Sequence, residues 1–316
     1  MEKNILPQLE FFEQLSESYD QLISWPTRIG TEGMFFKKLV NDNKLKSSLD
    51  VACSTGFHVI MLRRLGLDAV GIDASPKMIE KARTNSITCG VTVEYILGDF
   101  TNMSKRFSEG FDLITCLGDT VAHLKSAQDL RKLFQEVYKS LNPGGLFVIQ
   151  SRNYDFITKH HARFTPPTGA RNGTEETLFF RLLDFNPKSL NLSIAKFRWH
   201  ENRWESSVHT TEIYPHLKRE IESILKSVGF SKSEAYRNYN FEDYDPNGSD
   251  LILIAQKKGV LKSRNSSRRD KPTSKPEAQP KVAPKKKELP SKATAPRSAK
   301  PSKHKSARKP SAKPKK

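Results

Sequence analysis

Strand-like and helix-like segments alternate regularly along the chain between residues 47 and 151. Short apolar runs typical of buried strands alternate there with segments whose apolar residues recur at helical spacing. The strand-like segments are 47–53, 68–73, 91–97, 111–117 and 146–151, and the clearest helix-like segments are 58–65, 75–85 and 127–141. Strands joined through helices form a parallel sheet with right-handed crossovers and helices on both faces. The alternation therefore predicts an α/β, doubly wound, Rossmann-like fold.

Beyond residue 151 the pattern changes to longer β-rich segments. Three of them, at 176–185, 190–199 and 205–214, are separated by short turn candidates. They predict an antiparallel β insertion, within about residues 154–215, that covers the carboxyl ends of the parallel strands. A helix at 217–230 and a closing hairpin made of 233–239 and 249–256 follow. With that hairpin the sheet becomes seven-stranded and mostly parallel.

Residues 257–316 have a composition that excludes a folded core. Pro, Lys, Ser and Ala dominate, while Trp, Phe, Tyr and Ile are absent. This segment holds 22 lysines and arginines against three acidic residues, a net charge of +19, which leaves residues 1–256 nearly neutral with 31 basic and 32 acidic side chains. Such a segment cannot bury enough apolar surface to offset the entropy of ordering it. We therefore expect one domain over residues 1–256 and a disordered basic tail over 257–316.

The cysteines and the apolar runs indicate the environment of the protein. Cys53, Cys89 and Cys116 form no CxxC pair and lie in apolar surroundings, which favours a reduced protein of the cytoplasm. No apolar run approaches the roughly 20 residues that would span a bilayer, and the N-terminus does not resemble a secretory signal. The histidines are scattered, so no metal site is predicted.

The turn after the first predicted strand has the composition of a ligand-binding loop. Residues 50–58 read DVACSTGFH, a run of small residues between a strand and a helix. Small residues let the backbone approach a ligand closely, and the following helix offers free N–H groups. Because Gly56 is the only glycine in this turn, the G-x-G-x-x-G pattern of dinucleotide-binding proteins is missing.

Polar residues also follow the next three predicted strands. Asp73 ends the second strand, where a carboxylate can accept hydrogen bonds from both hydroxyls of a ribose. Asp99 and Phe100 follow the third strand, where they could bind and flank an adenine base. Gly118 and Asp119 follow the fourth. Since ligands of such sheets bind at the carboxyl ends of the strands, this order and spacing predict a nucleoside-binding crevice.

These motifs resemble a known family. LDVACSTG, GIDASPKM, LGDF, FDLITCLGD and LNPGGLFVI are similar to the successive motifs of class I S-adenosylmethionine-dependent methyltransferases, over a stretch from about Tyr19 to Gln256. CLGDTVAHL, SRNYDFI and YPHL further resemble the glycine and glycine/sarcosine N-methyltransferases and their prokaryotic relatives. The resemblance implies an enzyme that uses S-adenosyl-L-methionine to methylate the amine nitrogen of a small molecule, glycine, sarcosine or another amine.

The resemblance also implies which residues contact the cofactor. An N-terminal segment would close over it, with Arg28 paired to the cofactor carboxylate. Small residues would lie beneath the methionine portion, acids would bind ribose and adenine, and residues after the fourth strand would line the methionyl side. In chain order these residues are Tyr19, Trp25, Arg28, Ala52, Gly56, Asp73, Asp99, Phe100, Leu117, Gly118, Thr120 and His123. Ser54 replaces the usual second glycine of the first motif.

For the acceptor the resemblance implies four residues. Arg152 would hold a carboxylate as a planar, two-pronged donor, and Tyr154 and Tyr214 would flank the acceptor nitrogen and the methyl group. Asp119 stands where the glycine enzymes carry asparagine. A second carboxylate would repel an acceptor carboxylate unless protonated, so Asp119 better suits a cationic amine, which it would hold or deprotonate.

The basic tail keeps a second hypothesis open. Tethered lysines bind nucleic acid or another polyanion without sequence preference, and the absence of aromatic residues excludes base stacking. The chain could therefore be a small-molecule methyltransferase with an accessory tail. Alternatively, it could be a nucleic-acid-associated protein whose domain methylates a macromolecule or is inactive. The nearly neutral charge of residues 1–256 favours the first hypothesis, and no segment indicates an oligomer interface.

Overall fold

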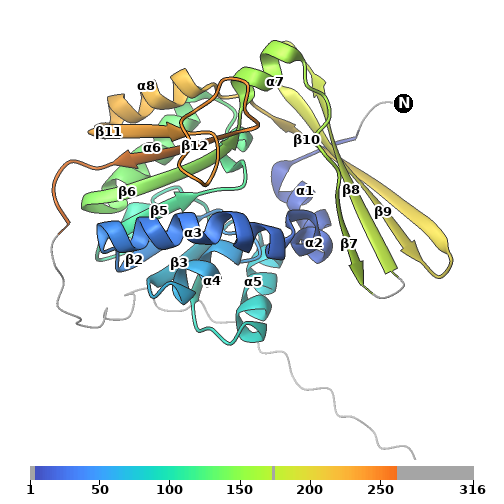
Figure 1. Ribbon diagram of the computed structural model, residues 1–316, viewed down its shortest axis with the longest axis horizontal. Coiled ribbons are helices and arrows are strands. Elements are labelled where there is room, and N and C mark those ends of the chain that lie inside the picture. Colours follow the sequence, from blue (N-terminus) through green and yellow to red (C-terminus); the bar gives the residue numbers. More distant parts are fainter. Residues whose placement is uncertain (1–3, 173–174, 262–316) are drawn as a thin grey trace, which may run out of the picture. The chain divides into compact units, whose positions relative to one another are not determined.

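The computed structural model describes residues 4–172 and 175–261, which contain two β-sheets (Figure 1). The larger, which we call the central sheet, has the strand order β11-β12-β6-β5-β2-β3-β4. Neighbours from β6 to β4 are parallel, whereas β12 is antiparallel to both β6 and β11. The strands are β2 (Ser47–Val51), β3 (Asp68–Asp73), β4 (Glu94–Leu97), β5 (Phe111–Cys116), β6 (Leu141–Arg152), β11 (Lys232–Tyr236) and β12 (Asp250–Gln256). This topology confirms the predicted α/β, mostly parallel seven-stranded sheet.

Helices cover both faces of the central sheet, as predicted. One face packs against α6 (Ala127–Ser140) and α8 (Lys218–Val228), and the other against α3 (Trp25–Asn43), α4 (Phe57–Arg64) and α5 (Pro76–Thr88). Within β6 the side chains alternate between these two layers, because Phe147 and Ile149 lie in the first and Val148 in the second. The strand order reverses at β2, so the crevice at its carboxyl end is the expected ligand site.

One helix start follows its sequence signal, whereas one strand begins earlier than its sequence suggests. Ser75 caps α5 by accepting a hydrogen bond from the Met78 amide at 3.2 Å, and Pro76 is the first helical residue. By contrast, residues 142–145 (NPGG), which suggest a turn, belong to β6. Leu141 already pairs with Phe111, and the register shifts before Leu113. The turn residues therefore form an irregularity inside a longer strand.

The second sheet, which we call the cover sheet, is the predicted antiparallel insertion. Its order is β1-β10-β9-β8-β7, and all pairs except β1 with β10 are antiparallel. The strands are β1 (Ile5–Leu6), β7 (Thr168–Asn172), β8 (Glu175–Phe185), β9 (Leu190–His200) and β10 (Arg203–Ile213). The sequence pattern did not indicate β1, β7 or the helix α7 (Tyr154–His160) that opens the insertion.

An N-terminal segment is attached to the inner face of the cover sheet. Helices α1 (Gln8–Leu15) and α2 (Tyr19–Ile23) supply Phe11, Leu15 and Leu22, which pack with Phe179 of β8 and Ile194 of β9. Within residues 4–172 and 175–261, no helix combines the length and apolar character needed to cross a bilayer. Most of the predicted basic tail, from residue 262 onward, lies outside the described residues.

Candidate active site

A cavity of about 230 Å³ lies at the carboxyl ends of the central strands. Its walls combine the loops after β2, β3, β4 and β5 with residues of α1 and α2. It brings together ten of the twelve residues predicted to contact the cofactor: Tyr19, Arg28, Ala52, Asp73, Asp99, Phe100, Leu117, Gly118, Thr120 and His123. Two others, Trp25 and Gly56, are not part of its lining.

Those two residues lie behind the cavity and shape it. The Trp25 ring packs edge-on against Phe57, with 5.3 Å between ring centroids. Gly56 adopts φ +86°, and a Cβ there would come within 2.4 Å of the Tyr95 hydroxyl. A side chain at position 56 is therefore excluded both by backbone conformation and by space.

Asp73 connects two of the loops that form the cavity. Its Oδ2 accepts a hydrogen bond from the Ser54 amide at 2.8 Å, and its Oδ1 accepts one from the Ser75 amide at 2.9 Å. Burial raises the pKa of this carboxyl, and the bonds from the backbone oppose the rise. At the next strand end Asp99 accepts a bond from the Thr101 amide at 2.8 Å. Both carboxylates thus shape their loops and still face the cavity.

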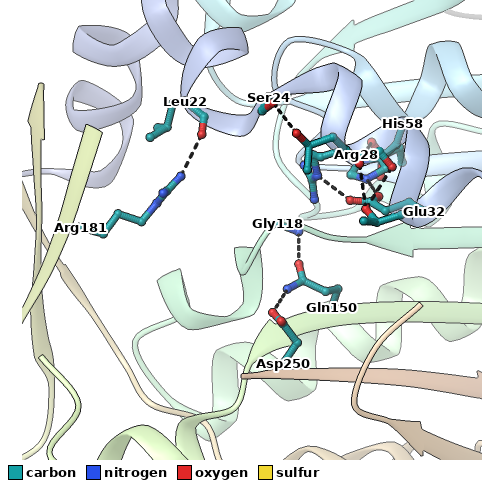
Figure 2. A network of polar contacts seen from close by, with 12 residues as sticks. Leu22, Ser24, Arg28, Glu32, His58, Gly118, Gln150, Arg181 and Asp250 are labelled. Carbon is teal, nitrogen blue, oxygen red and sulfur yellow. Dashed lines mark hydrogen bonds and ion pairs between the residues drawn. The ribbon is translucent and has the colours of Figure 1, made fainter. Parts of the chain in front are cut away.

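A buried ionic network supports the wall that contains Arg28 (Figure 2). Arg28 Nε donates to Glu32 Oε1 at 2.6 Å, and the other oxygen of Glu32 lies 2.8 Å from His58 Nε2. His58 Nδ1 lies 3.8 Å from Asp50 Oδ2. Neither Glu32 nor His58 was predicted to belong to the site. The spacing of Arg28 and Glu32, four residues apart on one helix, was the available signal.

A second set of contacts fixes the loop after β5 (Figure 2). The Gln150 side chain accepts from the Gly118 amide at 2.8 Å and donates to Asp250 Oδ1 at 3.1 Å. Because Gln150 belongs to β6 and Asp250 to β12, the relay joins three neighbouring strands of the central sheet. Neither residue was predicted to belong to the site.

His123 lines the cavity with an unpaired nitrogen. The residue belongs to a short 3₁₀ turn (Thr120–His123), and its ring packs edge-on against Phe12 with 5.0 Å between centroids. Its Nδ1 is buried and has no hydrogen-bond partner among the described residues. Burial lowers the pKa of His123 to about 4, although the nearby Asp119 charge acts to raise it. The ring is therefore neutral at pH 7.

Asp119, Arg152 and Tyr154 form one polar cluster. Asp119 Oδ1 accepts bonds from the Ser151 hydroxyl at 2.8 Å and the Arg152 amide at 3.0 Å, and its Oδ2 accepts one from the Tyr154 hydroxyl at 2.7 Å. Arg152 Nε lies 3.8 Å from Oδ2. Burial and the Asp119 charge keep the pKa of Tyr154 well above its usual value, so that the phenol stays protonated. None of the three lines the cavity itself, but Gly118 and Thr120, which flank Asp119, do.

Tyr214, the fourth predicted acceptor residue, lies apart from this cluster. Its amide donates to the Ala122 carbonyl at 2.7 Å, and its hydroxyl donates to Glu212 Oε2 at 2.7 Å. The bond to Glu212, helped by partial burial, raises the pKa of Tyr214 to about 12. The residue is not in the cavity lining.

Arg181 is a further basic residue near the site that the sequence analysis did not identify. It lies on β8, two residues after the fully buried Phe179, and donates to the Leu22 carbonyl at 3.2 Å and the Thr168 hydroxyl at 3.5 Å. Burial, together with the charge of Arg152, lowers the pKa of its guanidinium to about 10. An arginine within the apolar run LFFRLL was the signal available in the sequence.

Comparisons with known proteins agree with this geometry. Residues 49–145 match a family model described as "Methyltransferase domain". The glycine/sarcosine N-methyltransferase of Aphanothece halophytica is 29% identical over 253 residues, which cover 79% of this chain and 91% of that protein. The enzyme of the same name from Halorhodospira halochloris is 28% identical, with 79% of this chain and 89% of that protein covered.

A solved structure shares the fold. An S-adenosylmethionine-dependent methyltransferase from Clostridium acetobutylicum superimposes with a TM-score of 0.63 at 19% sequence identity, covering 78% of this chain and 99% of that one. At this identity the likeness concerns the fold alone. The shared fold agrees with the matched domain, with the relatives aligned over most of their length and with the cavity at the strand ends. This chain is a class I S-adenosylmethionine-dependent methyltransferase.

Proposed function

We propose that this enzyme methylates the amine nitrogen of a small acceptor that carries a carboxylate, such as glycine or sarcosine. The observation that carries the proposal is the cluster of Asp119, Arg152 and Tyr154 directly behind two cavity-lining residues. The cluster offers a carboxylate and a guanidinium, which supports an acceptor that is a zwitterionic amino acid. The names of the relatives from Aphanothece halophytica and Halorhodospira halochloris support the same acceptor class.

The cavity suits a nucleoside that bears an amino-acid chain. Asp73 offers a carboxylate for the ribose hydroxyls, and Asp99 with Phe100 lies at the next strand end, where adenine would bind. Arg28 and His123 line the same cavity, and the His123 Nδ1 has no hydrogen-bond partner among the described residues, so we propose that both contact the methionyl group. Trp25 and Gly56 would act indirectly, by supporting the residues that line the cavity.

The bound cofactor supplies a methyl group already activated on a sulfonium, so the protein has to align the acceptor and exclude water. The cover sheet and the N-terminal segment would exclude water, since α1 and α2 form part of the cavity wall. Asp119 accepts three hydrogen bonds, which leave it room for about one more donor. The amine of the acceptor is the donor that we propose, while Tyr154 acts as a positioning residue that holds Asp119, and Tyr214 would bound the acceptor space from the cover-sheet side.

The experiment that tests this function measures S-adenosylhomocysteine formation by the full chain with glycine, sarcosine, dimethylglycine and glycinamide. We expect turnover of at least one carboxylated amine and much weaker turnover of glycinamide, which lacks the acid. A folded protein that binds S-adenosylmethionine in a calorimeter but methylates none of these amines would refute the proposal. Assays with DNA and RNA in the same series test the alternative acceptor, which nothing in the described residues favours.

A further inference from the structure

Arg181 interacts electrostatically with two other arginines, Arg28 and Arg152, and each of those two already has a carboxylate partner. Arg28 is paired with Glu32 at 2.6 Å, and Arg152 lies 3.8 Å from Asp119. Arg181 has no carboxylate within 4.0 Å among the described residues. Its positive charge is therefore the one that the described part of the site leaves unbalanced.

The position of Arg181 makes this charge available to a ligand. The side chain extends from β8 of the cover sheet toward the carbonyl of Leu22 (Figure 2). Leu22 belongs to α2, whose Tyr19 lines the cavity, so the guanidinium lies against the helix that forms this wall. Its charge also interacts with Arg28 of the cavity lining and with Arg152 and Asp119 of the cluster at the ends of β5 and β6.

The contacts of Arg181 leave most of its donors unused. A guanidinium has five N–H groups, and the described residues accept from two of its nitrogens: Nη2 donates to the Leu22 carbonyl and Nη1 to the Thr168 hydroxyl. Both acceptors are neutral, so they orient the group without neutralising it. A half-buried cation that is repelled by Arg28 and Arg152 is held at a cost in free energy, which a bound anion would relieve.

We propose that Arg181, rather than Arg152, supplies the countercharge for the carboxylate of the acceptor. The inference rests on the proposed function, because it assumes an acceptor with an acid group. It explains how an aspartate at position 119 is compatible with such an acceptor. Arg152 and Asp119 neutralise each other, and the acceptor carboxylate and Arg181 form the second neutral pair. The carboxylate of the acceptor is thereby drawn toward the cover sheet and away from Asp119.

The test uses acetate as the probe, because it carries the acid without the amine. The full chain is saturated with S-adenosylhomocysteine, and the acetate dissociation constant is measured by NMR titration. We expect Arg181→Gln to weaken acetate binding about 10- to 100-fold, as is typical for loss of a charged hydrogen-bonding partner. Arg181→Lys should give an intermediate value, since it keeps the charge but loses the planar, two-pronged geometry. Methylammonium, which has the amine without the acid, is titrated in the same way as the control ligand for acetate.

The matched control variant removes the other ion pair. Asp119→Asn combined with Arg152→Gln deletes one charge of each sign, and we expect acetate binding within about threefold of the wild type. In an Asp119→Asn background Arg152 is freed, so part of the loss caused by Arg181→Gln should be recovered. Unchanged melting temperature and S-adenosylhomocysteine affinity show that each variant is folded.

Two results would overturn the inference. The first is an acetate dissociation constant that does not change in Arg181→Gln. The second is no acetate binding by the wild type up to 100 mM, which corresponds to a binding free energy weaker than roughly 1.4 kcal/mol. Neither result depends on turnover. A wild type that binds acetate through Arg181 but methylates no amine would instead contradict the proposed function. The two proposals can therefore fail separately.

Discussion

Among the single residues of the site, Asp73 both holds a loop and lines the cavity. It holds the backbone of Ser54 and Ser75 through its two oxygens, and it also lines the cavity where a ribose would bind. A carboxylate has about four lone-pair positions, so two backbone bonds leave two for the ribose hydroxyls. The same side chain can therefore shape the loop and bind the ligand.

Replacing Asp73 tests this dual role. We expect Asp73→Ala to weaken S-adenosylmethionine binding about 100-fold or more, because charged hydrogen bonds to the ligand and to the loop are lost together. Asp73→Asn keeps the shape and should give a smaller loss. The measurement is calorimetric titration of the full chain. Binding of S-adenosylmethionine by the alanine variant with wild-type affinity would exclude Asp73 from the site.

The lowered pKa of His123 predicts how the free energy of unfolding depends on pH. Its pKa is about 4 in the folded protein and near 6.5 when unfolded, so below pH 6.5 the unfolded state binds a proton that the folded state does not. The free energy of unfolding should therefore fall as the pH is lowered from 6.5 to 4. In His123→Phe that fall should shrink by up to about 3 kcal/mol. Urea unfolding at several pH values measures it.

An exposed histidine provides the control for that series. His160 lies at the end of α7 and is exposed. Because its side chain keeps its water on folding, His160→Gln should leave the pH profile of the wild type unchanged. Equal pH profiles for His123→Phe and the wild type would show that His123 does not account for the acid sensitivity.

The sequence located the acids at the strand ends because their position follows from local order: a strand, a turn and a helix. It did not locate His58 or Arg181, because each acquires its role from a partner that is distant in the chain, and it missed Glu32 although Arg28 is only four residues away. His58 meets Glu32 across 26 positions, and Arg181 meets the Leu22 carbonyl across 159. Such pairs depend on how helices and sheets pack, which periodicity does not describe.

At the scale of elements, β8 presents different environments on its two faces. Phe179 is fully buried against α1 and α2, whereas the adjacent Phe180 points to the other face and is 38% exposed. Alternation along a strand explains the contrast. The inner face therefore ties the N-terminal segment to the cover sheet.

Two substitutions in neighbouring positions test that attachment. Phe179→Ala should lower the free energy of unfolding by about 3–5 kcal/mol, since it opens a cavity in a buried cluster. Phe180→Ala should cost far less, because the ring is partly in water. Chemical denaturation measures both. Similar losses for the two variants would show that the inner face does not control the stability of the cover sheet.

The elements that the sequence missed share a physical cause. β1 has two residues and β7 five, and each is defined by the strand with which it pairs. Neither is long enough to show periodicity. In β6 the residues NPGG favour a turn locally, and the pairing with β5 passes over them from Leu141 to Leu146, so the turn residues form an irregularity within a longer strand.

At the scale of the whole molecule, charge is divided between two parts of the chain. Residues 1–256 are close to neutral, and residues 257–316 carry a net charge of +19. We therefore expect the catalytic domain and the basic segment to have different electrostatic partners. We expect removal of residues 262–316 to leave S-adenosylmethionine affinity and turnover unchanged.

The same truncation should abolish binding to nucleic acid. The full chain is expected to bind DNA and RNA weakly, with an affinity that falls steeply as salt rises from 50 to 200 mM. Fluorescence anisotropy with duplexes of unrelated sequence measures both properties. Salt-independent binding, or binding retained by residues 1–261, would show that the domain itself recognises nucleic acid.

The attachment of the N-terminal segment has a kinetic consequence. β1 pairs with β10, and the Leu22 carbonyl is held by Arg181, so the N-terminal segment that forms part of the cavity wall is hydrogen-bonded to the cover sheet. We therefore expect that an opening that admits the cofactor also loosens the enclosure of the acceptor. Both products would leave during the same opening of the N-terminal segment and the cover sheet. The turnover number would then equal the rate at which this opening occurs. Turnover that slows in proportion to solvent viscosity is the expected signature.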